Sequence, residues 1–127
     1  NHYWSAQEYD RPFYISGILV RLIPFKDKMG RDMARVVLDT PFGECAVYVF
    51  ARAWDRYSRL FHLAMQAPSL TGRLLTLKVS RQKFMNNDTV ILINAYPAEE
   101  GKAIWQSYLQ DCLIPAVSSY SRYRFYA

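Results

Sequence analysis

The stretch from residue 13 to residue 50 decides the fold and reads FYISGILVRLIPFKDKMGRDMARVVLDTPFGECAVYVF. It opens with an apolar, β-branched run over residues 13–25, which is too long for an ordinary flat strand. Gly17 lies within this run, where a strand could bend sharply and serve two sheets. A short charged loop follows, and then two segments of alternating polarity at 33–39 and 44–50. This order predicts the first three strands of a small, curled β-barrel.

The alternation also predicts which side chains face the barrel interior. One face of each segment is apolar, and its members are Ala34, Val36 and Leu38 in the second strand and Cys45, Val47 and Val49 in the third. Arg35 lies on the opposite face of its strand, and so does Tyr48. We therefore expect Arg35 and Tyr48 to share one exposed surface.

After residue 50 the apolar period changes from two to about 3.6 residues, which predicts a helix over residues 51–67 that ends before Pro68. The apolar members fall on one stripe: Trp54, Tyr57, Phe61, Ala64 and Met65. Arg52, Arg56 and Arg59 fall on the opposite side. The stripe indicates a helix that packs on the barrel with its arginines outward.

Strand character returns over residues 70–82, and a turn at 83–88 leads into a closing strand at 89–96. Apolar residues at helical spacing over 99–113 predict a C-terminal helix, which Pro115 ends. The expected organisation is an N-terminal arm at 1–12, a barrel at 13–97, a C-terminal helix at 98–117 and a basic and aromatic tail at 118–127.

Composition favours one folded, basic domain. The 127 residues are 51% hydrophobic and 16% aromatic, and 16 Lys and Arg against 11 Asp and Glu give a net charge of +5. That balance favours a polyanionic partner. No apolar run approaches the ~20 residues of a membrane span, so we expect no membrane contact and an intracellular protein of the cytoplasm, nucleoid or nucleus. Cys45 and Cys112 are expected to be free thiols.

Catalytic and metal-binding motifs are not recognisable in the sequence. The two histidines, His2 and His62, have no Cys, His or carboxylate at metal-ligand spacing. No phosphate-binding glycine loop and no serine nucleophile motif occurs. We therefore expect a protein that is not an enzyme and that uses no metal or cofactor.

Three strands, a helix and a two-stranded hairpin is the strand order of the oligonucleotide/oligosaccharide-binding (OB) fold. The stretches ISGILV, MGRDMARVVLDTPFG and ECAVYVF resemble OB domains of the anticodon-binding and replicative polymerase type. The resemblance covers about residues 14–96, although the first loop is short and the tail fits no known pattern. It implies a five-stranded OB-fold barrel with a helix between strands three and four. It also implies single-stranded nucleic-acid binding.

In such barrels the bound strand crosses the second and third strands between two loops. Transferred by position, the resemblance assigns phosphate contacts to Lys26, Lys28, Arg31 and Arg35 on one side and to Arg81 and Lys83 on the other. It assigns base stacking to Tyr48 and Phe84, and base-edge hydrogen bonds to Asn86 and Asn87.

Other interpretations stay open. Each cation taken singly equally fits a solvated loop, and the three arginines of the first helix fit either a solvated face or an extension of the nucleic-acid track. The prediction is a low-specificity accessory protein that binds single-stranded DNA or RNA, for example in DNA replication. The alternative is a protein-docking or oligomerising subunit of a nucleic-acid-processing complex, in which the C-terminal helix contacts a protein partner or a second copy through Trp105 and Tyr108.

Overall fold

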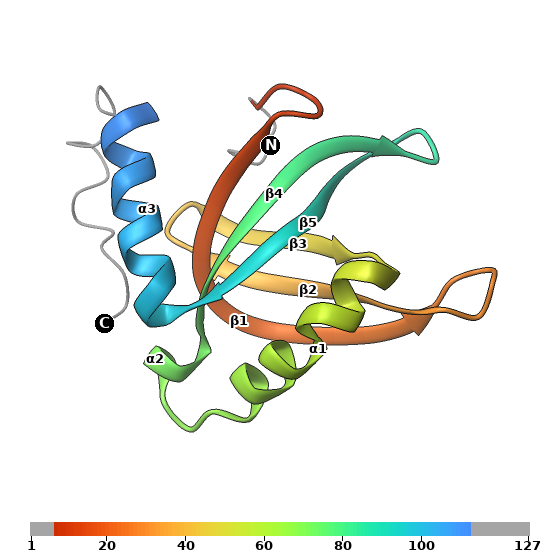
Figure 1. Cartoon of the computed structure of the whole chain (residues 1–127), viewed down its shortest axis with the longest axis horizontal. Coiled ribbons are helices and arrows are strands. Elements are labelled where there is room, and N and C mark those ends of the chain that lie inside the picture. The colour runs from red at the N-terminus through yellow and green to blue at the C-terminus, as the bar shows by residue number, and fades with distance from the viewer. Residues whose placement is uncertain (1–6, 113–127) are drawn as a thin grey trace.

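Five strands close into a barrel in the order β1-β2-β3-β5-β4 (Figure 1). The computed structural model describes residues 7–112. The strands are β1 (Pro12–Lys26), β2 (Asp32–Thr40), β3 (Gly43–Val49), β4 (Leu74–Phe84) and β5 (Asn87–Pro97). Helices α1 (Ala51–Gln66) and α2 (Leu70–Arg73) connect β3 to β4, and α3 (Ala98–Cys112) follows β5. The predicted OB-fold barrel is confirmed, with a helix after the third strand and a helix after the fifth.

Strand β1 serves two neighbours and bends near its middle. Its first half pairs antiparallel with β4 and its second half pairs antiparallel with β2, and Ile18 has a partner on both sides. Next to it, a Cβ at Gly17 would overlap the carbonyl oxygen of Asp39 and lie 2.9 Å from the carbonyl carbon. Glycine is required here because the backbones of β1 and β2 approach too closely for a side chain.

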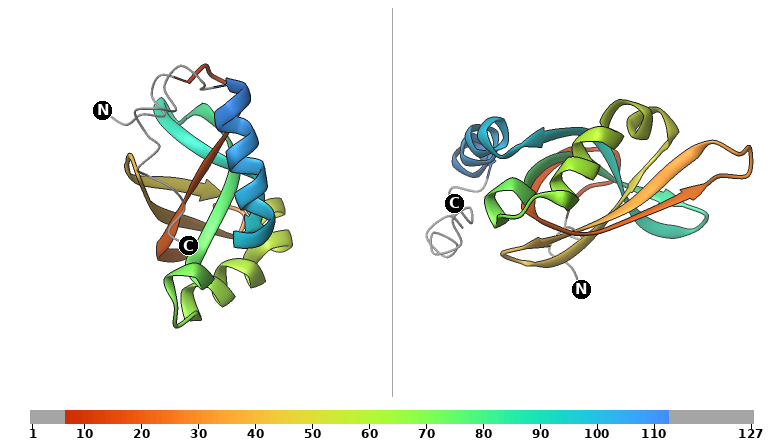
Figure 2. Two further views of the ribbon diagram at one scale, coloured as in Figure 1. Left: turned by 90° about the vertical axis from the view of Figure 1, so that its left-hand side faces the viewer. Right: turned by 90° about the horizontal axis from the view of Figure 1, so that it is seen from below.

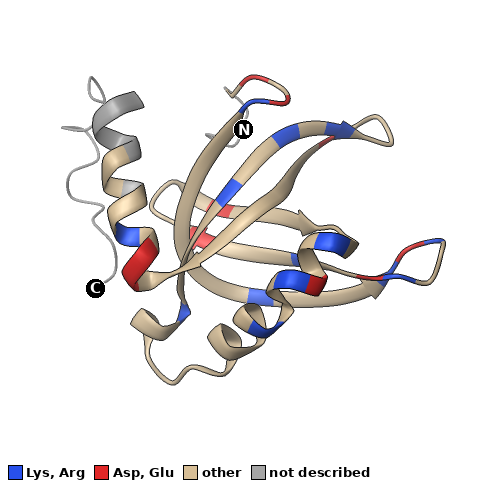
Figure 3. Ribbon diagram, viewed as in Figure 1, with Lys and Arg blue, Asp and Glu red and all other residues tan. Residues whose placement is uncertain are grey.

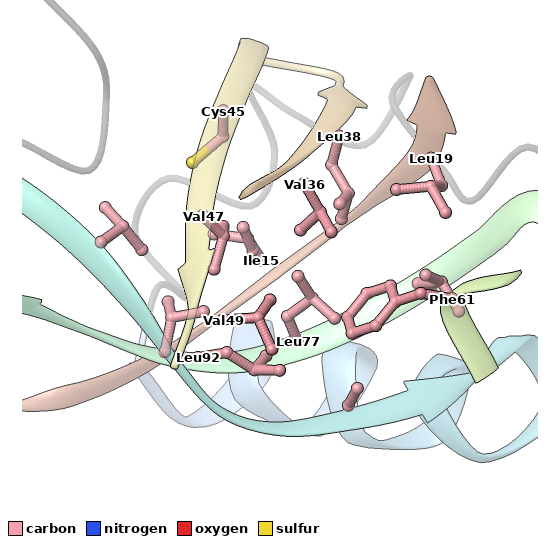
Figure 4. Packing of buried hydrophobic residues seen from close by; sticks show 14 of the residues in the cluster. Ile15, Leu19, Val36, Leu38, Cys45, Val47, Val49, Phe61, Leu77 and Leu92 are labelled. Atoms are coloured by element: carbon pink, nitrogen blue, oxygen red, sulfur yellow. The ribbon is translucent and has the colours of Figure 1, made fainter. Parts of the chain in front are cut away.

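The core follows the predicted alternation (Figure 4). The inward faces of β2 and β3 are fully buried, as expected: Ala34, Val36, Leu38, Cys45, Val47 and Val49. Helix α1 closes the barrel with Trp54 and Phe61, whose rings stack with centroids 6.3 Å apart. Its three arginines lie on the exposed side, as predicted. Helix α3 contacts the outer side of β1, β4 and β5 (Figure 2).

The closure of the barrel is uneven. Strands β4 and β5 pair antiparallel along the whole of β4. Strands β3 and β5 pair in parallel through one bridge, Tyr48 with Ile91.

Two local predictions were wrong. The strand expected from residue 70 begins at Leu74, because Ser69 caps a short helix by accepting a hydrogen bond from the Gly72 amide at 3.2 Å. The turn expected over residues 83–88 consists only of Met85 and Asn86, which both have positive φ. Such a two-residue turn suits the twist of a hairpin and leaves the residues on either side in the ladder.

Three parts of the prediction lie outside the described residues. They are the first six residues of the arm, residues 113–117 of the expected C-terminal segment, and the basic and aromatic tail at 118–127.

Cys45 provides a test of core burial. It is a free, buried thiol, and burial raises its pKa from an ordinary 9.0 to about 12. We expect a thiol reagent at pH 8 to label Cys45 in a Cys112→Ser variant only as fast as the protein unfolds. Because the folded pKa is raised, this burial supports stability fully below pH 9, and the contribution is lost as the pH rises from about 9 to about 12. Fast labelling that urea does not accelerate would contradict the burial.

Candidate nucleic-acid interface

A cleft of about 810 Å³ lies between the β1–β2 loop, the β4–β5 turn and the start of α1. Figure 1 shows the loop and the turn projecting on the same side of the barrel, with the first turn of α1 between them. The residues that line the cleft come from β1, β2, β3, β4 and α1, which are distant in sequence. The barrel therefore creates at this end a surface that no single segment carries.

Aromatic rings form much of the cleft lining. Phe25 from β1 meets Tyr48 from β3 edge-on, with ring centroids 6.3 Å apart. Phe50, which precedes α1, lies 5.4 Å from Phe84 of β4 at a tilt of 53°. Phe84 keeps 43% of its surface exposed, which leaves ring area for a ligand. Flat, partly exposed rings offer the stacking surface that unpaired bases need.

The β1–β2 loop is folded around one carboxylate. Asp27 accepts hydrogen bonds at 2.9 Å from the amides of Met29 and Arg31, and at 2.7 Å from the Arg31 guanidinium. These bonds, led by the one from the Arg31 amide, lower the pKa of Asp27. Gly30 has a φ of 78°, which closes the turn. The loop therefore has a defined shape that presents Lys28 and Met29 at the cleft.

The cations at the cleft and in the space beside it are of two kinds, those with an ion pair and those without. Lys26 is paired with Asp32 at 2.8 Å, and Arg31 is engaged with the loop carboxylate. Lys28, Arg35 and Arg52 form no ion pair with any residue that the structure describes. The second group therefore has its full charge available to a ligand.

A second hollow of about 300 Å³ lies beside the cleft, between the outer face of β1, β2 and β3 and the start of β5, and its lining includes the carboxylates of Glu44 and Asp88. Val37 and Ala46 are paired in its floor, and Arg35 and Tyr48 form the next pair along the ladder. Tyr48 lines both spaces, so the hollow and the cleft are neighbours at this side chain. The expectation that Arg35 and Tyr48 share one exposed surface is therefore met. Val37 also lines this hollow, and it is only 4% exposed despite its outward face.

The N-terminal segment docks on the β4–β5 hairpin. The Tyr9 hydroxyl donates a short hydrogen bond to Asp88, and the Arg81 guanidinium donates to the same carboxylate at 2.8 Å. These two bonds lower the pKa of Asp88, with the Tyr9 bond as the larger cause. Arg81 also donates to the Gln7 carbonyl and lies 4.2 Å from the Tyr9 ring centroid. Its side chain is 14% exposed, so this cation holds the segment in place.

The structure thus brings together half of the predicted contacts. Five predicted residues line the cleft, namely Lys26, Lys28, Arg31, Tyr48 and Phe84, and Arg35 lines the adjoining hollow. Three others lie elsewhere on the hairpin: Lys83 has its ammonium 5.7 Å from the Tyr9 ring, while Asn86 in the turn and Asn87 in the ladder do not line the cleft. Trp105 and Tyr108 belong to α3, and their side chains lie outside the described residues.

Phe25 and Phe50 line the cleft but were not predicted as interface residues, and Arg52, which the sequence left open between a solvated face and an extension of the nucleic-acid track, lines it too. Phe50 lies two residues after Tyr48, so the alternation of residues 44–50 puts it on the same outward face as Tyr48. That aromatic residue was the signal that could have been used.

The strand order, the helix after the third strand and a cleft between two loops are the arrangement of the OB fold. The chain matches no protein-family model and no curated protein sequence. Within the described residues, no group of three or more His, Cys, Asp or Glu side chains could hold a metal ion. No helix in that part of the chain is long and apolar enough to cross a membrane.

Proposed function

We propose that this domain binds single-stranded DNA or RNA with little sequence preference. The observation that carries the proposal is the cleft in which four aromatic rings lie beside cations that have no ion pair among the described residues. The nucleic-acid strand would enter at the cleft, cross Tyr48 and continue over the outer face of β2 and β3. This path follows the cleft and the neighbouring hollow, which both have Tyr48 in their lining.

Base stacking accounts for the expected lack of sequence preference. Every base has a π-face, and stacking on an aromatic side chain contributes about 1 to 3 kcal/mol per base. Phe84 and Tyr48 both line the cleft, where each meets a second ring. A duplex cannot use these rings, because its bases are already stacked and paired. We therefore expect a strong preference for single strands.

Phosphate contacts would come from the cations that the protein leaves without an ion pair. Lys28 lies at the tip of the β1–β2 loop, Arg35 in the hollow and Arg52 in the first turn of α1. That first turn carries no acidic residue, so no side chain there offsets the positive end of the helix dipole. Three cations along one path fit a backbone with regularly spaced charges.

The wider role follows from the same resemblance. We propose an accessory, non-catalytic factor related to OB domains of the anticodon-binding and replicative polymerase type, at work inside the cell in a process such as DNA replication. DNA and RNA differ at the 2′-hydroxyl, so one or two contacts would decide between them.

A protein-docking role is the second candidate. The observation that favours it is the exposure of two methionines at the same cleft, Met29 at 78% and Met85 at 68%. Flexible methionines suit apolar protein surfaces. In this candidate α3 would supply a further contact through Trp105 and Tyr108.

Fluorescence anisotropy with labelled single-stranded DNA, single-stranded RNA and duplex DNA tests the proposal. We expect tight, salt-sensitive binding to a single strand and weak binding to the duplex. Phe84→Ala should weaken single-strand binding about tenfold, the effect of one lost stacking contact. Leu63→Ala is the matched control, because Leu63 is 56% exposed on α1 and does not line the cleft. No binding at low salt, or an unchanged affinity of Phe84→Ala, would reject the groove and favour the protein-docking candidate.

A further inference from the structure

We propose that the bound strand leaves the cleft along α1, where Arg52, Arg56 and Arg59 form a cationic track for its phosphates. The inference rests on the proposed function, and it extends the binding surface from the cleft to the outer face of α1. The ligand is the same single strand, and the track would lengthen its footprint on the protein.

The spacing of the three arginines places them on one line. At 100° per residue, positions 52, 56 and 59 fall within about 60° of arc on a helix. They span seven residues, or about 10 Å along the axis, which is enough for about two or three phosphates of one strand. Figure 3 shows Lys and Arg positions over the first half of α1, with one acidic position among them.

The track begins inside the cleft. Arg52 lines it together with Lys28 and Phe84. A phosphate held between Arg52 and Lys28 would therefore be followed by phosphates that lie over the next turns of α1. The remaining two arginines continue in the direction that leads away from the rings. Because of this continuity, the helix face is an extension of the candidate site.

The charges on this face contribute one cation–π contact and no ion pair to the described part of the fold. Arg52, Arg56 and Arg59 are exposed, and none forms an ion pair within the part of the chain that the structure describes. Arg56 lies over the Tyr57 ring at 5.3 Å, which orders its stem and leaves its donors free for a phosphate. The helix carries a single acidic residue, Asp55.

Binding of oligonucleotides of two lengths distinguishes contacts to the arginine track from contacts to the cleft. The experiment measures binding of the full chain to dT oligonucleotides of two lengths, about 6 and about 14 nucleotides, within the range that OB folds cover. The variant is Arg56→Gln/Arg59→Gln. We expect it to bind the longer oligonucleotide about tenfold more weakly at low salt, and its log–log salt dependence should fall by about 1.4, for two phosphates at 0.7 each. Binding of the shorter oligonucleotide should not change.

Two controls exclude trivial causes. Arg11→Gln/Lys102→Gln removes the same charge away from α1 and should leave both lengths unaffected. Arg56→Lys/Arg59→Lys keeps the charge and should retain most of the salt dependence. Wild-type binding of both lengths with no effect of Arg56→Gln/Arg59→Gln would overturn the track and leave the groove intact. Equal losses at both lengths, or from the distant control, would also overturn it. Failure of the wild type to bind either length would instead reject the proposed function itself.

Discussion

Gly17→Ala is expected to lower the free energy of unfolding by about 3 kcal/mol, at the upper end of overpacking effects. The new methyl group would overlap the Asp39 carbonyl oxygen. Neither atom can move easily, because Ile18 pairs with Asp39 on one side and with Leu74 on the other. The strain therefore falls on the β1–β2 and β1–β4 ladders together. Urea denaturation followed by circular dichroism measures the change.

Gly30→Ala is the matched control for Gly17→Ala. Gly30 has a φ of 78°, and a Cβ there would meet nothing within 4 Å. Its substitution should cost about 1 kcal/mol from backbone conformation alone. If Gly17→Ala costs no more than Gly30→Ala, the close approach of β1 and β2 is not what requires glycine at the bend.

Lys28→Gln/Arg35→Gln/Arg52→Gln is expected to weaken single-strand binding on the order of 100-fold at low salt. These cations have no ion pair among the described residues, so their removal breaks nothing in the fold and takes away charge that phosphates would meet. The log–log salt dependence should fall by about 2, for three phosphates at 0.7 each. Anisotropy titrations at several salt concentrations measure both quantities.

The control for this triple variant is Arg11→Gln/Lys78→Gln/Lys102→Gln. It lowers the net charge by the same amount at positions that line neither the cleft nor the hollow. Its affinity should stay within a few-fold of the wild type. A similar loss in both triple variants would mean that overall charge, and not this surface, attracts the strand.

The sequence predicted well those strands and helices that bury one side, because burial of one side leaves a periodic pattern of apolar residues. The period of two in β2 and β3 and the period near 3.6 in α1 arise because one side of each element is buried. Helix α2 has only four residues, which is too short to show a period. The hairpin turn was predicted too long, because Asn86 and Asn87 both tolerate turn geometry while Met85 gives no turn signal.

The candidate site was predictable where the fold itself brings two loops together, as for Lys28 and Phe84. The direction in which the chain leaves β3 could not be predicted, because the packing of Trp54 and Phe61 inside the barrel sets it. That direction brings Arg52 to the cleft. The engagement of Arg81 with Tyr9 joins residues far apart in sequence, and no local pattern signals such a contact.

A single bridge pairs β3 with β5, so this seam closes the described barrel with fewer backbone hydrogen bonds than its other seams. Local opening begins where the fewest backbone hydrogen bonds cross between neighbours, so the barrel should open first at Tyr48 and Ile91. Tyr48 also lines both the cleft and the hollow. In the proposed complex, a nucleic-acid strand lying across Tyr48 would keep the barrel closed, because any ligand that binds only the closed form adds to its stability. Ligand binding and opening of the barrel would then be coupled through this one tyrosine.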